Sequence, residues 1–261
     1  MKGVVLAAFA ASILAGCAAT IGLPQGIPPD GYTELVSTPL GPFRYFRSLS
    51  TVPGRKDLPA LESVHCASTQ HEILLLMAAG TQIDVADTCM RIDAAAKFSE
   101  SWIEAKANRY RILLAPTDTA ATIQSRTFGS FSGGKTLALA ASIHDDRERT
   151  VANLVDLVAH ETFHALGHAT RHPQALDERI AYYAGLCAQL QVNGVVREDS
   201  LPGAAIGTDD AAVQLSSQAA YRVRLETYPL LADGRIQMNE QSGEGMLQRC
   251  SQLRRGLTRS R

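Results

Sequence analysis

Two histidines and a glutamate form the most chemically informative pattern in the chain, His160–Glu161–Thr162–Phe163–His164. Residues four apart on a helix lie one turn apart on the same face, so both imidazoles can bind one tetrahedral ion such as Zn²⁺. Glu161 then lies beside the open position of that ion. From there it can take a proton from a zinc-bound water, which is much more acidic than free water. The pattern predicts a zinc site with His160 and His164 as ligands and Glu161 as general base.

A second motif, at residues 129–136, reads Gly-Ser-Phe-Ser-Gly-Gly-Lys-Thr and matches the G-x-x-x-x-G-K-[ST] pattern of P-loops. A P-loop follows a buried apolar strand and opens a long helix, but residues 123–128 are mostly polar. Only seven residues, 137–143, separate the motif from His144-Asp145-Asp146. We interpret the glycines as a turn into a strand and keep nucleotide binding as a minor alternative.

Apolar spacing predicts the elements that must position these residues. Asp145 or Asp146 is expected to cap the helix that carries the histidines, which ends near Gly167. Other helices are expected over residues 70–79, 92–108, 176–192 and 211–226. Strands are expected over residues 109–114 and 136–143, with a short one near residues 43–46. The fold class expected from this order is α+β, mainly helical, with a small mixed sheet.

The strand, short loop and helix with H-E-x-x-H resemble the core of the zincin metallopeptidases, over about residues 109–192. The resemblance implies a zinc-dependent endopeptidase that hydrolyses peptide or protein substrates. In that fold the strand before the metal-binding helix is an edge strand that binds substrate by adding its backbone to the sheet. Residues 136–143 occupy this position, with an ordinary core strand as the alternative.

The resemblance also bears on the third zinc ligand. Metzincins use H-E-x-x-H-x-x-G-x-x-H, and this chain follows the pattern as far as Gly167 but has Thr170 in place of the third histidine. This departure counts against a metzincin. His168 and His172 stay open as ligands at a shifted position.

Gluzincins instead take a glutamate from the helix that follows, and this resemblance implies Glu178, fourteen residues after His164. Ala181 completes an arrangement that resembles the E-x-x-A of several such families. A small residue there lets two helices approach closely. Asp177 is the neighbouring alternative, and a solvated acid at a helix start is the structural alternative for Glu178.

The N-terminal segment does not belong to the fold. A single positive charge and a short apolar stretch precede residues 14–17, which read Leu-Ala-Gly-Cys and resemble the lipobox of bacterial lipoproteins. The resemblance implies that residues 1–16 are a signal peptide and that Cys17 is lipidated, for example with palmitate. Ala18, rather than Asp, implies passage to the outer membrane. We therefore expect the chain on the periplasmic face of that membrane, held by its lipid.

Four cysteines remain once Cys17 is lipidated, and an oxidising compartment predicts that they form two disulfides. Four cysteines allow three pairings. We favour Cys66 with Cys89 and Cys187 with Cys250, because each pair ties helical segments within its own half of the chain. Four buried free thiols are the alternative.

Length and charge restrict the remaining choices. The chain has 261 residues, and its 25 basic and 26 acidic side chains create no overall field that would attract nucleic acid. Residues 17–60 are rich in proline and glycine and read as a tether. Residues 61–261 are then one zincin-like domain. The rival to a peptidase is a non-catalytic envelope lipoprotein with the same fold and a binding or assembly role.

Other residues carry weaker signals. His65 and His71 could form a second metal site, although we favour surface positions for both. The basic tail, with Arg249, Arg254, Arg255, Arg259 and Arg261, is expected to be solvated. Five residues could stabilise an oxyanion: Tyr182, Tyr183, Tyr221, Tyr228 and His144.

Overall fold

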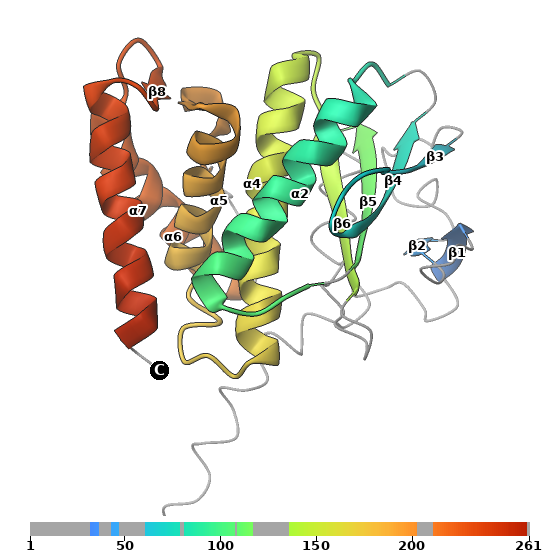
Figure 1. Cartoon of the computed structure of the whole chain (residues 1–261), viewed down its shortest axis with the longest axis horizontal. Coiled ribbons are helices and arrows are strands. Elements are labelled where there is room, and N and C mark those ends of the chain that lie inside the picture. Colours follow the sequence, from blue (N-terminus) through green and yellow to red (C-terminus); the bar gives the residue numbers. More distant parts are fainter. Residues whose placement is uncertain are drawn as a thin grey trace, which may run out of the picture.

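The structure, a computed structural model, describes residues 32–36, 43–46, 61–78, 81–107, 109–116, 136–202 and 211–259. The predicted signal segment, Cys17 and residues 129–135 lie outside these ranges. Within them the fold class is α+β, as predicted, with helices packed beside a small mixed sheet (Figure 1).

The described part of the sheet has four strands, in the order β3 (Leu61–His65), β4 (Glu72–Ala78), β5 (Arg109–Pro116) and β6 (Thr136–Ile143). β3 is antiparallel to β4, whereas β4, β5 and β6 are parallel. The two strands predicted here, β5 and β6, are confirmed. β6 forms one edge of the described sheet, the place that the edge-strand interpretation expects.

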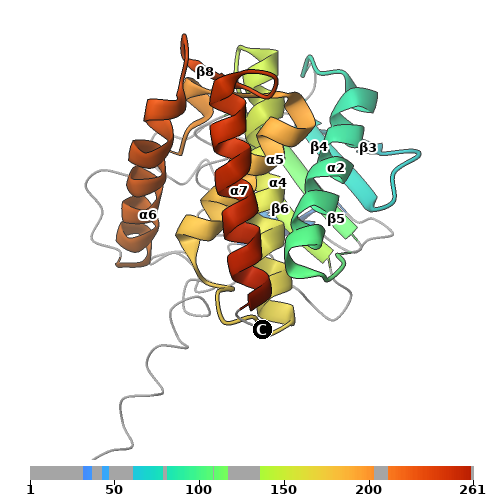
Figure 2. The ribbon, with the colours of Figure 1, turned by 60° about the vertical axis from the view of Figure 1, so that its left-hand side comes forward.

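Among the described residues, five long helices stand beside this sheet in successive layers (Figures 1 and 2). α2 and α4 lie next to the strands, α5 packs on α4, and α6 and α7 lie farthest from the sheet. Within the described residues, none of these helices is both long enough and apolar enough to cross a membrane. Their bounds are α2 Val85–Ile103, α4 Arg147–Ala169, α5 Glu178–Asn193, α6 Ala211–Thr227 and α7 Gln241–Arg259.

The helix predicted over residues 70–79 is wrong, because residues 72–78 form strand β4. Five consecutive residues, 73–77, are all buried, and each is 4% exposed or less. A helix beside a sheet buries one face and exposes the other, whereas a strand inside a covered sheet can bury both faces. The short apolar run therefore belongs to a buried strand.

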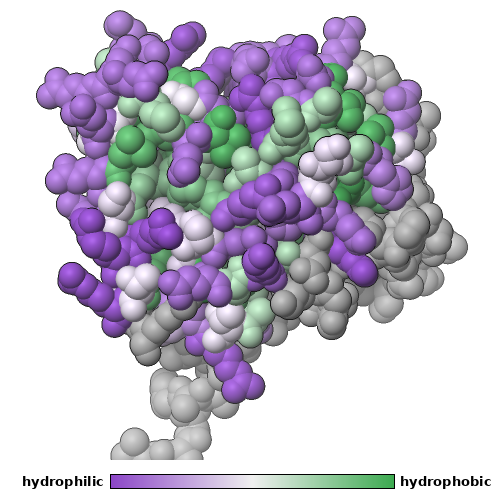
Figure 3. Space-filling model, viewed as in Figure 1, coloured by the Kyte–Doolittle hydropathy of each residue, from purple (hydrophilic) through white to green (hydrophobic). Residues whose placement is uncertain are grey.

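The basic tail forms helix α7, and its described arginines after residue 250 are solvated as predicted. Arg249 differs from the prediction, because it is half-buried and donates to the Tyr183 hydroxyl and the Glu226 carbonyl. Met246, Cys250 and Leu257 are buried on one face of α7, while Arg254, Arg255 and Arg259 are exposed. Hydrophilic side chains make up much of the molecular face seen in Figure 3, and hydrophobic residues lie in patches between them. The C-terminal segment is an amphipathic helix that contributes to the core.

Short elements complete the fold. The strand predicted near residues 43–46 is confirmed as β2 (Phe43–Phe46), which pairs with β1 (Tyr32–Val36) inside the predicted tether. β7 (Val195–Arg197) pairs with β8 (Arg235–Gln237). In the described part of the chain, single turns of 3₁₀ helix follow β7 and α6, namely η3 (Glu198–Ser200) and η4 (Tyr228–Leu230).

The residues after the glycine-rich motif argue against a P-loop. In a P-loop the lysine and the following hydroxyl residue open a helix whose N-terminus faces the phosphates. Here Thr136 begins strand β6. The turn-into-strand interpretation agrees with this element, and the nucleotide alternative lacks its required helix.

Both predicted disulfides are confirmed. Cys66 bonds Cys89 and ties the β3–β4 connection to α2, while Cys187 bonds Cys250 and ties α5 to α7. Since residues 72–78 form a strand, the first bond joins a strand connection to a helix rather than two helices. The second bond fixes α5 to α7.

Removing either disulfide should destabilise the protein. Closing loops of 23 and 63 residues lowers the entropy of the unfolded chain by amounts worth about 3 and 4 kcal/mol respectively. We expect Cys66→Ser/Cys89→Ser and Cys187→Ser/Cys250→Ser each to lower the free energy of unfolding by up to these amounts, measured by urea denaturation. An unfolding midpoint equal to that of the oxidised parent in both double variants would contradict the role given to these bonds.

Candidate metal centre

Helix α4 is fixed to the core by residues in and beside the H-E-x-x-H motif. The Ser99 hydroxyl on α2 donates to the Ala159 carbonyl at 2.7 Å, and the hydroxyls of Tyr110 on β5 and Thr162 are hydrogen-bonded at 3.0 Å. Phe163 is fully buried. These contacts hold one side of α4 against α2 and the sheet. The two histidines of the motif project from a different side of α4, the side on which α5 packs.

Helix α5 starts where its first residue can face α4. The Asp177 side chain accepts a hydrogen bond from the Ile180 N–H at 3.1 Å and so caps the helix, which makes Glu178 the first helical residue. Ala181 is fully buried and Gly185 follows one turn later. Small side chains at these positions let α5 pack closely on α4.

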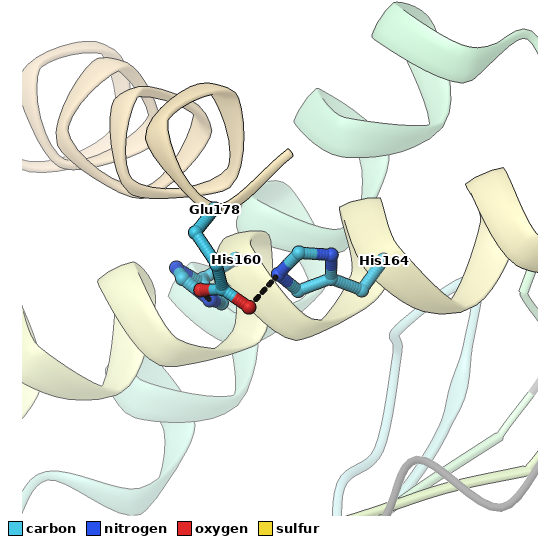
Figure 4. A group of neighbouring side chains, drawn as sticks. All are labelled: His160, His164 and Glu178. Carbon is cyan, nitrogen blue, oxygen red and sulfur yellow. Dashed lines mark ion pairs between the residues drawn. The ribbon is translucent and has the colours of Figure 1, made fainter. Parts of the chain in front are cut away.

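Three side chains meet between the two helices (Figure 4). Glu178 places one carboxylate oxygen 3.5 Å from His160 Nε2 and the other 3.3 Å from His164 Nε2. The three candidate ligand atoms all lie within 4.8 Å of one another. The Glu178 side chain is 31% exposed and the two histidines are 10% and 18% exposed, so solvent reaches the group.

The donor set fits a zinc ion. His164 Nε2 is buried and makes no hydrogen bond among the described residues, although it faces Glu178. Two imidazole nitrogens and one carboxylate are a common ligand set of catalytic zinc, which leaves a fourth position open. A buried ring nitrogen that makes no hydrogen bond and faces a carboxylate is a donor that an ion could take up.

Without a metal ion, the charged forms of both His164 and Glu178 are favoured. Burial alone lowers the pKa of His164, but the adjacent Glu178 and the nearby Glu161 raise it to about 9. Burial works against ionisation of Glu178, yet its contacts with His160 and His164 hold its pKa well below the usual range. A proton thus occupies the position that a cation would take, and the two compete for the same nitrogen.

A hydrogen bond at the ring nitrogen that faces away from Glu178 sets the orientation of His164. Its Nδ1–H donates to the Ala175 carbonyl at 2.7 Å, which leaves Nε2 for the shared group. Gly167 makes this contact possible, because a Cβ at that position would lie 2.9 Å from both Cα and Cβ of Ala175. The glycine that matches the metzincin pattern therefore serves a turn that supports His164, a role that the sequence did not reveal.

The other candidate ligands do not join the group. His172 is buried, but its Nε2–H donates to the Leu257 carbonyl and its Nδ1 accepts from the Gln174 N–H. His168 is exposed near the end of α4, and Asp177 is used as the cap of α5. Among the four alternatives, the structure brings Glu178 to the two histidines.

The interpretation of both upstream histidines as surface residues is wrong for His71. His65 is exposed, but His71 is 5% exposed and lies between two carboxylates. Its Nδ1 is 2.7 Å from Asp93 and its Nε2 is 2.9 Å from Glu100. Since both ring nitrogens are engaged, His71 joins β4 to α2 and presents no free nitrogen for a second metal site.

Of the five residues considered for oxyanion stabilisation, Tyr182 contacts the centre. Its ring centroid lies 4.6 Å from that of His160. The Tyr183 hydroxyl instead donates to Glu226 on α6 at 2.6 Å. The remaining three lie on α6, on η4 and just before α4: Tyr221, Tyr228 and His144.

Sequence reasoning also missed Gly185 as a structural part of the centre. A Cβ at this position would overlap the carboxylate of Asp156, which lies on α4 one turn before His160. Burial raises the pKa of Asp156 to about 6. The small residues on α5 indicated a close helix contact, but they did not indicate that Asp156 lies opposite Gly185.

Comparisons with protein-family models, with curated proteins and with solved structures found no match to this chain. The geometry of the centre and the chemistry of its residues are therefore what indicate a function.

Replacing Gly185 by alanine should push α5 away from α4. We expect Gly185→Ala to lower the free energy of unfolding by about 1–3 kcal/mol, as overpacking commonly does, and Asp156→Ala in the same chain to recover part of that loss. Gly256→Ala on α7 is the matched control, since nothing lies within 4 Å of a Cβ there. Equal unfolding free energies for Gly185→Ala and Gly256→Ala would show that the helix crossing tolerates the side chain.

Proposed function

We propose that this chain is a zinc metallopeptidase of the zincin type, gluzincin-like in its ligands and anchored by lipid to the bacterial envelope. One observation carries the catalytic part of the proposal. Ligand atoms of His160, His164 and Glu178, from two different helices, lie within 4.8 Å of one another, and Glu161 follows His160 on the same helix.

Each residue has a distinct role in this proposal. His160, His164 and Glu178 hold the ion, and the Ala175 carbonyl keeps His164 turned toward it. When bound, zinc supplies Lewis acidity that polarises a peptide carbonyl and makes water easier to deprotonate. The half-buried Glu161 accepts the proton of the attacking water and returns it to the leaving amine.

The strand position supports a peptide substrate. β6 has β5 as its neighbour on one side and forms an edge of the described sheet, and α4 packs against it. An extended peptide can hydrogen-bond to such an edge through its backbone. This arrangement favours hydrolysis of extended or unfolded segments of protein.

Two confirmed features of the fold support export. Disulfides Cys66–Cys89 and Cys187–Cys250 form and persist in oxidising compartments such as the periplasm. The lipobox-like residues 14–17 then supply the anchor at Cys17. Together they favour the periplasmic face of the outer membrane.

The metal and the base can be separated by mutation. We expect the purified protein to hold about one zinc ion and to hydrolyse an unfolded protein such as casein, with activity lost on chelation. Glu161→Gln should retain zinc and lower kcat by about 10²- to 10⁴-fold. Glu178→Ala should lose the ion, whereas His172→Ala should keep it. Zinc content by atomic absorption and casein hydrolysis are the measurements.

Glu148→Gln is the matched control, because Glu148 is an exposed acid on the same helix. Full zinc in the wild type with no hydrolysis of casein would favour the non-catalytic lipoprotein. Zinc retained by Glu178→Ala but lost from His172→Ala would refute the ligand assignment.

The anchor can be tested on the full chain expressed in a bacterial host. Cys17→Ser should abolish acylation and move the protein from the detergent phase to the aqueous phase of a Triton X-114 separation. Ala18→Asp should remain acylated but shift from the outer to the inner membrane fraction. Detergent-phase partition of Cys17→Ser would exclude Cys17 as the anchor.

A further inference from the structure

The two histidines of the centre are held in different ways. His164 is fixed by the hydrogen bond from Nδ1 to the Ala175 carbonyl. For His160, no hydrogen bond to Nδ1 is found among the described residues, and its Nε2 faces Glu178. What lies against the His160 ring is an aromatic side chain, Tyr182.

Tyr182 packs on His160 edge to face. The ring centroids are 4.6 Å apart and the ring planes are inclined at 64°, which is the preferred geometry of aromatic pairs. The His160 ring also lies 4.9 Å from the ring of His164 at 70°. His160 is buried and Tyr182 is half-buried, so the contact joins a buried ring to a partly exposed one.

One helix supplies both the carboxylate and this ring. Tyr182 follows Glu178 by one turn of α5, so both side chains project from the same face toward α4. Between them Ala181 is fully buried. Docking of α5 therefore brings Glu178 to the histidine nitrogens and Tyr182 to the side of the His160 ring in a single step.

We propose that Tyr182 is a positioning residue of the metal centre, whose aromatic ring holds the His160 imidazole with Nε2 turned toward Glu178. The inference depends on the proposed function in one respect, that His160 is a zinc ligand. Without the ring, the imidazole gains rotational freedom that zinc binding must then remove. The role is assigned to the aromatic ring, which phenylalanine retains.

Zinc affinity tests the ring separately from the hydroxyl. We expect Tyr182→Leu to weaken zinc binding by about 3- to 10-fold, the range of an aromatic pair contact, in competition with a chromogenic chelator. Tyr182→Phe should bind zinc within about 2-fold of the wild type. With cobalt(II) in place of zinc, the visible absorption bands should change in Tyr182→Leu and stay the same in Tyr182→Phe.

A metal-free measurement tests the contact itself. The ring protons of His160 should have the same ring-current shift in NMR spectra of the wild type and of Tyr182→Phe, and should lose that shift in Tyr182→Leu. Tyr183→Phe is the control for a purely structural loss, because the Tyr183 hydroxyl bonds Glu226 and Arg249 away from the centre. It should lower the free energy of unfolding and leave zinc affinity unchanged.

The outcomes separate this inference from the proposed function. A wild type that binds no zinc refutes the proposed function, whatever the NMR spectra show. A wild type that binds zinc, with equal affinity and cobalt spectrum in Tyr182→Leu, overturns the positioning role. Equal losses in Tyr182→Phe and Tyr182→Leu would assign the effect to the hydroxyl and overturn it as well.

Discussion

Close packing of α5 on α4 is the constraint on which the rest of this structure depends. His160 and His164 lie on α4 and Glu178 lies on α5, with 3.5 and 3.3 Å between each histidine Nε2 and the nearer carboxylate oxygen. A small separation of the helices would therefore break these contacts. The start of α5 is set by its capping aspartate, and its distance from α4 by small residues at the crossing. The disulfide from α5 to α7 and the hydrogen bonds of Arg249 hold α5 from its other side. The grouping of His160, His164 and Glu178 therefore depends on the packing of α4, α5 and α7 together.

The charges of Glu178 and His164 stabilise each other. A partly buried carboxylate next to two imidazoles is stabilised in its ionised form, and it stabilises a proton on His164 in turn. A divalent cation would take over this role with more charge and with defined geometry. The same side chains can therefore hold the helices together before and after an ion binds. The Ala175 carbonyl keeps His164 in one orientation in both cases.

Features that depend on neighbouring residues in the sequence could be predicted, whereas features that depend on distant residues could not. Helices α4 and α5 carry their own caps and apolar faces, so their positions and the approach of Glu178 followed from spacing together with the family resemblance. Strand β4 was mistaken for a helix because a short apolar run fits both until its neighbours are known. The burial of His71 depends on Asp93 and Glu100, which are 22 and 29 residues away. Likewise Gly167 serves contacts that only the folded chain creates.

The central claim is that one zinc ion binds at the crossing of α4 and α5. Anomalous diffraction from crystals of the zinc-loaded protein, recorded on both sides of the zinc absorption edge, tests it most directly. The account predicts one strong peak about 2.0–2.2 Å from Nε2 of His160, Nε2 of His164 and a carboxylate oxygen of Glu178. A peak bound by His168 or His172, or no peak between these two helices, would contradict it.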